Sequence, residues 1–177
     1  MRGSWQVDEN LPLHLTDVVT IVSVVALWTG RPRLVELTYF WALTASLQAL
    51  LTPNLTERTA DIFVWTFFIT HGGAIVAAIL LVFGLRIVPP AGAVPRVFGA
   101  TVVVAATAAL GDLITGGNYM FLREKPSTAS LLDVMGPWPV YIVSAAVLAL
   151  GLFAVLDVPL RRARWRGSSA GGRDADP

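Results

Sequence analysis

The sequence predicts an all-α protein, a polytopic transmembrane helix bundle with about five spans. Of its 177 residues, 55% are hydrophobic and only 14% are charged, and the mean hydropathy of +0.66 is too high for a soluble domain. Five apolar runs of helix length are separated by segments that contain Gly, Pro or charged residues. Because Lys and Arg are confined to these segments, no nucleic-acid-binding surface is predicted.

The apolar runs occupy five ranges in chain order. The expected spans are 11–28, 34–51, 62–85, 97–115 and 138–156. The third run would form about 36 Å of helix and contains no Asp, Glu, Lys or Arg. The first run contains His14 and Asp17, and its uninterrupted apolar part is short for a span. We therefore expect that helices upstream of it are missing.

Helix-breaking residues mark the ends of these runs. Asn10 is suited to cap the first helix, and the Gly30 to Pro32 segment ends it. Thr52 and Pro53 end the second helix, and the connection 86–96 is stiffened by three prolines. The fourth run is rich in Ala and Gly, which lets helices approach closely.

Two further segments complete the chain. The connection 116–137 is long but rich in apolar residues, so we expect it to be ordered and to hold a short interfacial helix over 127–135. The first 160 residues are expected to form one transmembrane domain. Residues 161–177 are expected to form a basic tail that is disordered past Arg166.

The distribution of positive charge predicts the orientation. One side of the expected bundle holds Arg31, Arg33, Arg86, Arg96 and the five arginines of the tail. The other side holds Arg2, Arg58, Arg123 and Lys125. Because the positive side usually faces the cytoplasm, we expect a multi-pass protein of the cell membrane with its N-terminus outside and its C-terminus in the cytoplasm.

His71 stands within the charge-free third run, where a titratable group usually faces a protein interior or a wet cavity. Several polar residues are predicted to lie in the same outer half of the membrane, namely His14, Asp17, Gln48, Thr52, Asn54, Asp112, Asn118 and Arg123. A shared polar pocket that reaches His71 is the simplest interpretation.

Structural roles remain open for the same residues. Thr16 and Asp17 suit a helix cap, Asp112 suits an interfacial pair with Arg123, and Gln48 suits a bridge between helices. His71 suits either a structural hydrogen bond or acid–base catalysis. The two histidines and nearby aspartates lack the spacing of metal ligands, and we predict no metal and no cofactor.

Five motifs carry a resemblance to a known family. They are LPLHLTD at 11–17, LLTPNL at 50–55, THG at 70–72, GNYMFLREKP at 117–126 and LLDVMGPWP at 131–139. In this order, over about residues 11–156, they resemble the bacterial YwaF-like integral membrane proteins. The resemblance implies seven spans in a complete member, two of them upstream of this chain.

The YwaF-like family is similar to the transmembrane protein 164 group of glycerophospholipid acyltransferases, which use a cysteine and a membrane-embedded histidine. The resemblance places that histidine at His71 and that cysteine at Leu13, beside His14. The chain contains no cysteine. A covalent acyl-enzyme is therefore implied only if Thr16 or Thr52 replaces the cysteine, as a threonine does in the androgen-induced hydrolases of fatty acid esters.

Three functions follow from these observations. The first is acyl transfer or ester hydrolysis on a phospholipid in the bilayer. Its catalytic candidates are His71, Thr52, Thr16 and His14. Its substrate-binding candidates are Asp17, Gln48, Asn54, Asp112, Asn118, Tyr119, Arg123 and Lys125.

The second function is binding or transport of a small solute or lipid, with His71 as a proton relay. The third is an accessory membrane protein without chemistry. The oligomeric state is not predicted.

Overall fold

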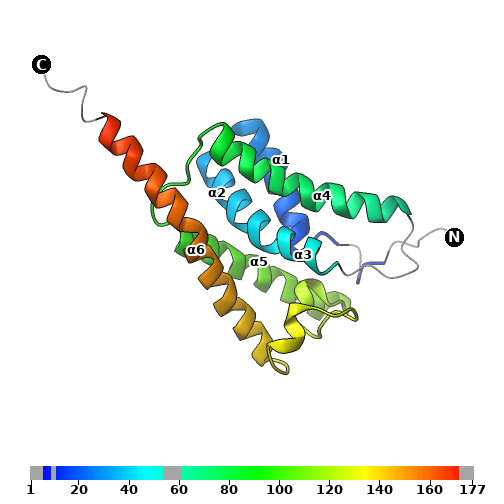
Figure 1. The fold of residues 1–177 in the computed structure, drawn as a ribbon. Coiled ribbons are helices and arrows are strands. Elements are labelled where there is room, and N and C mark those ends of the chain that lie inside the picture. The colour runs from blue at the N-terminus through cyan, green and yellow to red at the C-terminus, as the bar shows by residue number, and fades with distance from the viewer. Residues whose placement is uncertain (1–5, 9–10, 54–60, 172–177) are drawn as a thin grey trace, which may run out of the picture.

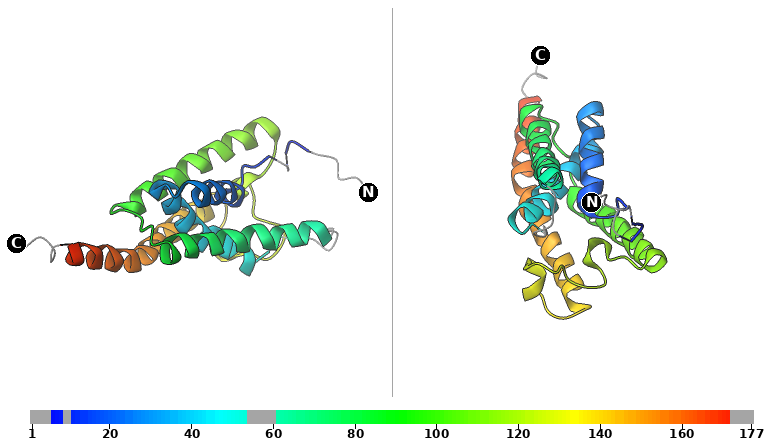
Figure 2. Two further views of the ribbon diagram at one scale, coloured as in Figure 1. Left: turned by 90° about the horizontal axis from the view of Figure 1, so that it is seen from above. Right: turned by 90° about the vertical axis from the view of Figure 1, so that its right-hand side faces the viewer.

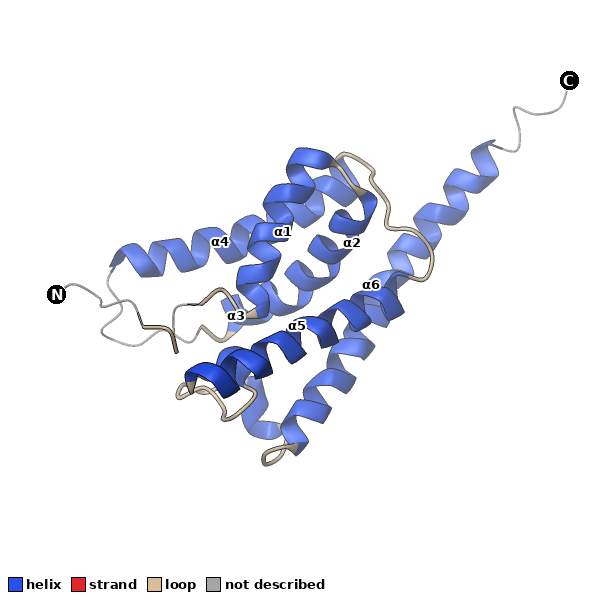
Figure 3. Ribbon diagram, turned by 180° about the vertical axis from the view of Figure 1, so that it is seen from behind, coloured by secondary structure: helices blue, strands red, loops and turns tan. Residues whose placement is uncertain are grey.

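The computed structural model describes residues 6–8, 11–53 and 61–171, and within these ranges the chain forms helices joined by loops, with no strand (Figures 1 and 3). Four helical stretches are long and apolar enough to cross a membrane: Pro32–Leu51, Ile62–Gly84, Ala93–Thr115 and Val140–Arg164. A fifth apolar helix, Leu15–Thr29, is shorter. The expected all-α membrane bundle is confirmed.

The elements follow each other in simple order. Helix α1 is Leu15–Thr29, α2 is Pro32–Trp41, α3 is Leu47–Leu51, α4 is Asp61–Ile79, α5 is Ala93–Thr115 and α6 is Val140–Gly171. A π-helical turn, Ala42–Ser46, joins α2 to α3, and a second, Leu80–Gly84, extends α4. Two 3₁₀ turns, Tyr119–Phe121 and Leu131–Val134, lie in the connection between α5 and α6. With 15 residues, α1 is only about 22 Å long, which is less than the hydrocarbon thickness of a bilayer.

Helix α2 occupies the centre of the packing. Helix α1 packs on α2 and α4, and α3 also packs on α4. Tyr39 donates its hydroxyl to the Leu156 carbonyl on α6 over 3.2 Å, and the Phe40 ring meets the Phe153 ring of α6 edge-on. Trp41 Nε1 donates to Thr101 Oγ1 of α5 over 2.9 Å. Three consecutive aromatic side chains of α2 therefore join the N-terminal helices to α5 and α6.

Helices α5 and α6 form a pair of their own. They pack together near the start of α5 and diverge toward the connection between them (Figures 1 and 3). That connection is ordered, as expected from its composition. Trp138 Nε1 donates to the Leu122 carbonyl over 3.0 Å, and the Tyr141 hydroxyl donates to the Phe121 carbonyl over 2.6 Å. These two bonds hold the loop against the first turn of α6.

Helix α6 extends into the segment that was expected to form the tail. Helix α6 does not end near residue 160 but continues through Pro159 to Gly171, and it extends beyond the other helices (Figure 2). The continuation has a local cause, because Arg161 and Arg164 both bind the buried Asp157 one and two turns earlier. These bonds offset the backbone hydrogen bond that Pro159 cannot donate.

Candidate functional site

A cluster of polar and aromatic side chains joins the start of α1 to the end of α5. Asp112, in the last turn of α5, is buried, and its Oδ1 accepts the backbone N–H of Tyr119 over 2.6 Å. The Tyr119 hydroxyl accepts the Leu11 N–H over 3.1 Å and donates to the Val7 carbonyl over 2.6 Å. Tyr119 therefore ties the segment before α1 to the segment after α5.

His14 completes this cluster. Its Nδ1 accepts the backbone N–H of Met120 over 3.2 Å, and its ring lies 5.4 Å from the Tyr119 ring and 5.7 Å from the Phe121 ring. Because Nδ1 acts as an acceptor, the neutral ring carries its proton on Nε2. A cavity of about 370 Å³ opens here, lined by Asp8, His14, Gly116, Gly117, Asn118, Tyr119 and Phe121.

Burial lowers the pKa of His14 below its ordinary value of 6.5. The negative charges of Asp17 and Asp112 raise this pKa, but their effect is smaller than that of burial. An unfolded chain then binds a proton at a pH where the folded chain does not. We expect stability to be retained above pH 6.5 and to fall as the pH decreases below it.

The measurement is the thermal midpoint in detergent between pH 5 and pH 8, for the natural chain and for His14→Asn. The variant should lose most of the acid-dependent decrease, because asparagine keeps an acceptor for Met120 N–H and cannot gain a proton. An identical pH dependence of the two proteins would contradict this assignment.

The basic residues of the α5–α6 connection serve its backbone. Arg123 Nη1 donates to the carbonyls of Gly116 and Gly117 over 2.6 and 3.1 Å. Asn118 Oδ1 accepts the N–H groups of Arg123 and Glu124 over 3.0 and 3.2 Å. The expected pair between Asp112 and Arg123 is not among these contacts, since Asp112 binds Tyr119 instead.

Lys125 has a separate place in the same connection. Its Nζ lies 3.4 Å from the Asp133 carbonyl and 5.6 Å from the centre of the Tyr141 ring. Its ammonium group therefore helps to fold the connection onto α6.

His71 lies on the packed face of α4 but apart from the His14 cluster. It is half-buried, one turn before the buried Ala74, and its Nδ1 lies 2.7 Å from the Phe67 carbonyl. Its ring stacks on the Phe67 ring with 4.2 Å between centres. Within the described part of the chain, no hydrogen bond, ion pair or ring contact joins His71 to the His14 cluster. His71 is also not among the residues that line the cavity at His14.

The remaining candidates make local contacts. Gln48 Nε2 donates to Thr52 Oγ1 over 2.9 Å, and Thr52 directly follows the last residue of α3. Asp17 Oδ2 accepts the backbone N–H of His14 over 3.2 Å and caps α1, as one of the two interpretations of the sequence predicted. Thr16 lies beside it in the first turn of α1. Asn54 lies outside the described residues.

Comparison with models of protein families identifies the family of this chain. Residues 1–157 match the sequence profile of the TMEM164 family. The chain belongs to the TMEM164 family. No curated protein and no solved structure matches it. Family membership agrees with a multi-pass membrane protein, since four apolar helical stretches in the described part of the chain are long enough to span a bilayer.

In this TMEM164-family chain, Leu13 occupies the position at which the resemblance places a cysteine. The Leu13 side chain packs onto Gly111 of α5, and its Cδ1 fills the space that a Cβ on Gly111 would need. Leu13 therefore has a packing role between the start of α1 and α5. Thiol chemistry at this position is excluded by the residue itself.

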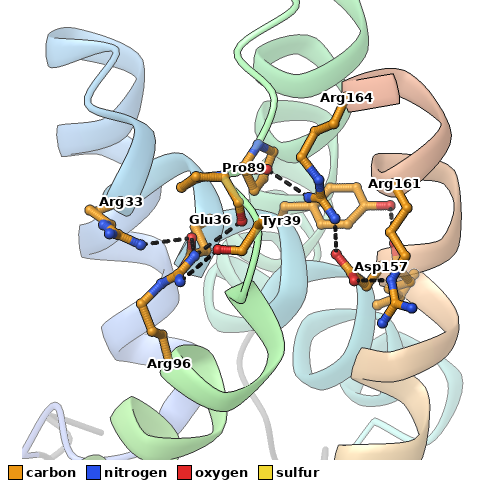
Figure 4. Close-up of polar contacts among 11 residues, drawn as sticks. Arg33, Glu36, Tyr39, Pro89, Arg96, Asp157, Arg161 and Arg164 are labelled. Atoms are coloured by element: carbon orange, nitrogen blue, oxygen red, sulfur yellow. Dashed lines mark hydrogen bonds and ion pairs between the residues drawn. The ribbon is translucent and has the colours of Figure 1, made fainter. Parts of the chain in front are cut away.

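A second polar centre of this TMEM164-family chain, drawn in Figure 4, lies near the starts of α2 and α5, whereas the His14 cluster lies at the end of α5. Glu36 is only 2% exposed, and Arg96 binds it through two nitrogens, at 3.0 and 2.7 Å. Arg33 lies 3.5 Å from the same carboxylate. On α6, Asp157 binds Arg161 over 2.6 Å and Arg164 over 2.9 Å.

Neither Glu36 nor Asp157 was named as a candidate from the sequence. The spacing of Asp157 to Arg161 and Arg164 is a local signal, because residues four and seven apart share a helix face. The Glu36–Arg96 pair joins residues 60 positions apart and has no local signal. The buried hydroxyls of Thr38 and Ser46, which have no hydrogen-bond partner among the described residues, were also missed.

Proposed function

We propose that this protein acts on an ester bond of a membrane phospholipid, by hydrolysis or acyl transfer, with His71 as the general base. The observation that carries the proposal is the fixed orientation of the His71 ring on the packed face of α4. Family membership is compatible with this activity, and the resemblance that places a membrane-embedded histidine at this position supports it.

The contacts of His71 select one tautomer. A carbonyl oxygen can only accept, so the short contact to Phe67 requires the proton on Nδ1. In the neutral ring, Nε2 is then the basic nitrogen. Stacking on Phe67 holds the ring in this orientation. A histidine anchored through Nδ1 with a basic Nε2 is the arrangement that general-base catalysis requires.

The chain lacks a cysteine, and the hydroxyl of Thr52 donates to the Gln48 carbonyl over 3.2 Å. We therefore propose a direct reaction without an acyl-enzyme. His71 Nε2 removes a proton from water or from a lipid hydroxyl, whose oxygen attacks the ester carbonyl carbon. The ester C–O bond then breaks, and the leaving alkoxide takes back from His71 the proton that Nε2 had removed. Nδ1 keeps its own proton, which bonds the Phe67 carbonyl. Thr16, whose hydroxyl makes no hydrogen bond in the described structure, is the threonine left to act as a nucleophile in the alternative covalent route.

His71→Gln is expected to lower acyl release or transfer at least about 100-fold, because the amide cannot accept a proton at neutral pH. The assay uses the purified chain and a phospholipid with a labelled acyl group. His14→Gln is the matched control, since it removes the other histidine and should retain most of the activity. A second variant, His71→Ala, removes the imidazole entirely. Unchanged turnover in His71→Ala would contradict the proposal.

A second function is favoured by the cavity at His14. Its walls combine Asp8, His14 and Asn118 with the Tyr119 and Phe121 rings, a composition suited to a small polar solute or a lipid head group. The exposed Arg123 lies at the same loop and has guanidinium nitrogens left for an anionic group. The test measures how much lipid or solute the purified natural chain and His14→Asn retain. Equal retention by the two proteins would contradict this function.

The location of the protein is part of the same proposal. We propose the cell membrane, with the His14 cavity on the outer side and the Glu36 and Asp157 centres on the cytoplasmic side. The excess of arginine at the latter end supports this orientation.

A further inference from the structure

A second cavity, of about 350 Å³, lies between the start of α5 and the last third of α6. It is lined by Ala91, Gly92, Val94, Pro95, Asp157, Arg161 and Arg164. The candidate span Ala93–Thr115 begins here, and the candidate span Val140–Arg164 ends here. The cavity is therefore at the depth where lipid head groups meet the protein.

The two arginines of this cavity differ in how many of their guanidinium nitrogens already donate hydrogen bonds. Arg164 uses both terminal nitrogens, for the Pro89 carbonyl at 2.8 Å and for Asp157 Oδ1 at 2.9 Å. Arg161 binds Asp157 Oδ2 through Nε alone, and its side chain is 69% exposed. Both terminal nitrogens of Arg161 are therefore left to donate to a ligand at the cavity rim.

The charges around the cavity do not balance. Asp157 faces two arginines, and on the neighbouring side of the α4–α5 connection Glu36 also faces two, Arg33 and Arg96 (Figure 4). Each group of one buried carboxylate and two arginines thus has one unit of positive charge that is not neutralised. An anion with two or more oxygens is the ligand that such a surplus of guanidinium groups binds best.

The surroundings indicate that this anion belongs to a lipid. On α6, Val155 and Val158 are exposed close to Asp157 in the chain; they do not line the cavity, but they form apolar helix surface beside it. The opposite wall of the cavity is apolar, made by Ala91, Val94 and Pro95. A ligand with a phosphate next to hydrocarbon matches both features, as in other basic pockets between transmembrane helices.

We propose that Arg161 and the cavity beside it bind the phosphate of an anionic phospholipid of the adjoining leaflet. This site lies apart from His71 and from the His14 cavity, and it does not depend on the proposed enzymatic activity. Arg164 and Asp157 have a positioning role, because their ion pair fixes Arg161 at the rim.

The test compares two charge-matched variants of the full chain, Arg161→Gln and Arg162→Gln. Both remove one positive charge from the same turn of α6, but Arg162 is exposed and makes no hydrogen bond or ion pair in the described structure. Native mass spectrometry of the detergent-solubilised protein would measure retention of phosphatidylglycerol against phosphatidylcholine. We expect the natural chain and Arg162→Gln to prefer phosphatidylglycerol and Arg161→Gln to lose about tenfold in affinity for it.

Arg161→Lys keeps the charge but lacks the planar fork, and it provides a second variant if Arg161→Gln fails to fold. It should keep the thermal midpoint of the natural chain and still bind phosphatidylglycerol more weakly. Equal losses in Arg161→Gln and Arg162→Gln would overturn the proposal in favour of general surface charge. Displacement of phosphatidylglycerol by an equal concentration of inorganic phosphate would overturn the lipid as the source of the anion.

Discussion

Arg96→Ala is expected to lower the free energy of unfolding by about 3 kcal/mol, because it leaves a buried carboxylate without its main partner. Glu36 accepts two hydrogen bonds from the Arg96 guanidinium and is shielded from solvent. Arg96 also donates to the carbonyls of Pro90 and Ala91, so its loss releases the α4–α5 connection as well. Chemical unfolding in detergent micelles, followed by helical circular dichroism, would measure the change.

Arg33→Ala is the matched control for this prediction. Its side chain is 62% exposed and its guanidinium lies 3.5 Å from Glu36, so its removal should cost less than about 1 kcal/mol. Adding Glu36→Gln to Arg96→Ala should recover part of the lost stability, because the uncompensated buried charge is then gone. Equal costs for the two single arginine variants would contradict the description of Arg96 as the principal partner.

Trp41→Ala should destabilise the protein by about 3 kcal/mol, because the substitution opens a large void in the core. Trp41 is 2% exposed and packs within the central cluster of α2 with α4, α5 and α6. Its indole N–H also donates to Thr101 on α5. The same unfolding assay applies, and Trp41→Phe should show an intermediate loss, since it keeps most of the volume but not the hydrogen bond.

Trp28 provides the comparison within the same chain. It is 91% exposed at the end of α1, and Trp28→Ala should change the unfolding free energy by less than about 0.5 kcal/mol. A loss in Trp28→Ala as large as that in Trp41→Ala would show that tryptophan content matters here rather than packing in the core.

The fold class could be predicted because the apolar runs set the helix ends. The run 62–85 agrees closely with the candidate span Ile62–Gly84, since a continuous charge-free stretch ends where polar residues and prolines begin. The end of α6 could not be read from Pro159. A proline usually ends a helix, and here the ion pairs of Asp157 outweigh that tendency.

The grouping of the polar residues was predicted only in part. Sequence position estimates how deep a residue lies in the membrane, but not toward which neighbour its side chain points around the helix. His14, Asp112, Asn118 and Tyr119 are brought together, whereas His71 makes its contacts within α4. Neither the Glu36–Arg96 pair nor the Leu13–Gly111 contact has a signal in local spacing, because each depends on how distant helices pack.

The length of α6 has a mechanical consequence. Its 32 residues form a rod of about 48 Å, whereas the hydrocarbon core of a bilayer measures roughly 30 Å. The part of the rod beyond Asp157 is clamped through Arg164 to the carbonyl of Pro89, so its base cannot swing independently of the α4–α5 connection. The end of the candidate span on α6 is therefore tied to the segment just before α5, which sets where the helix leaves the membrane.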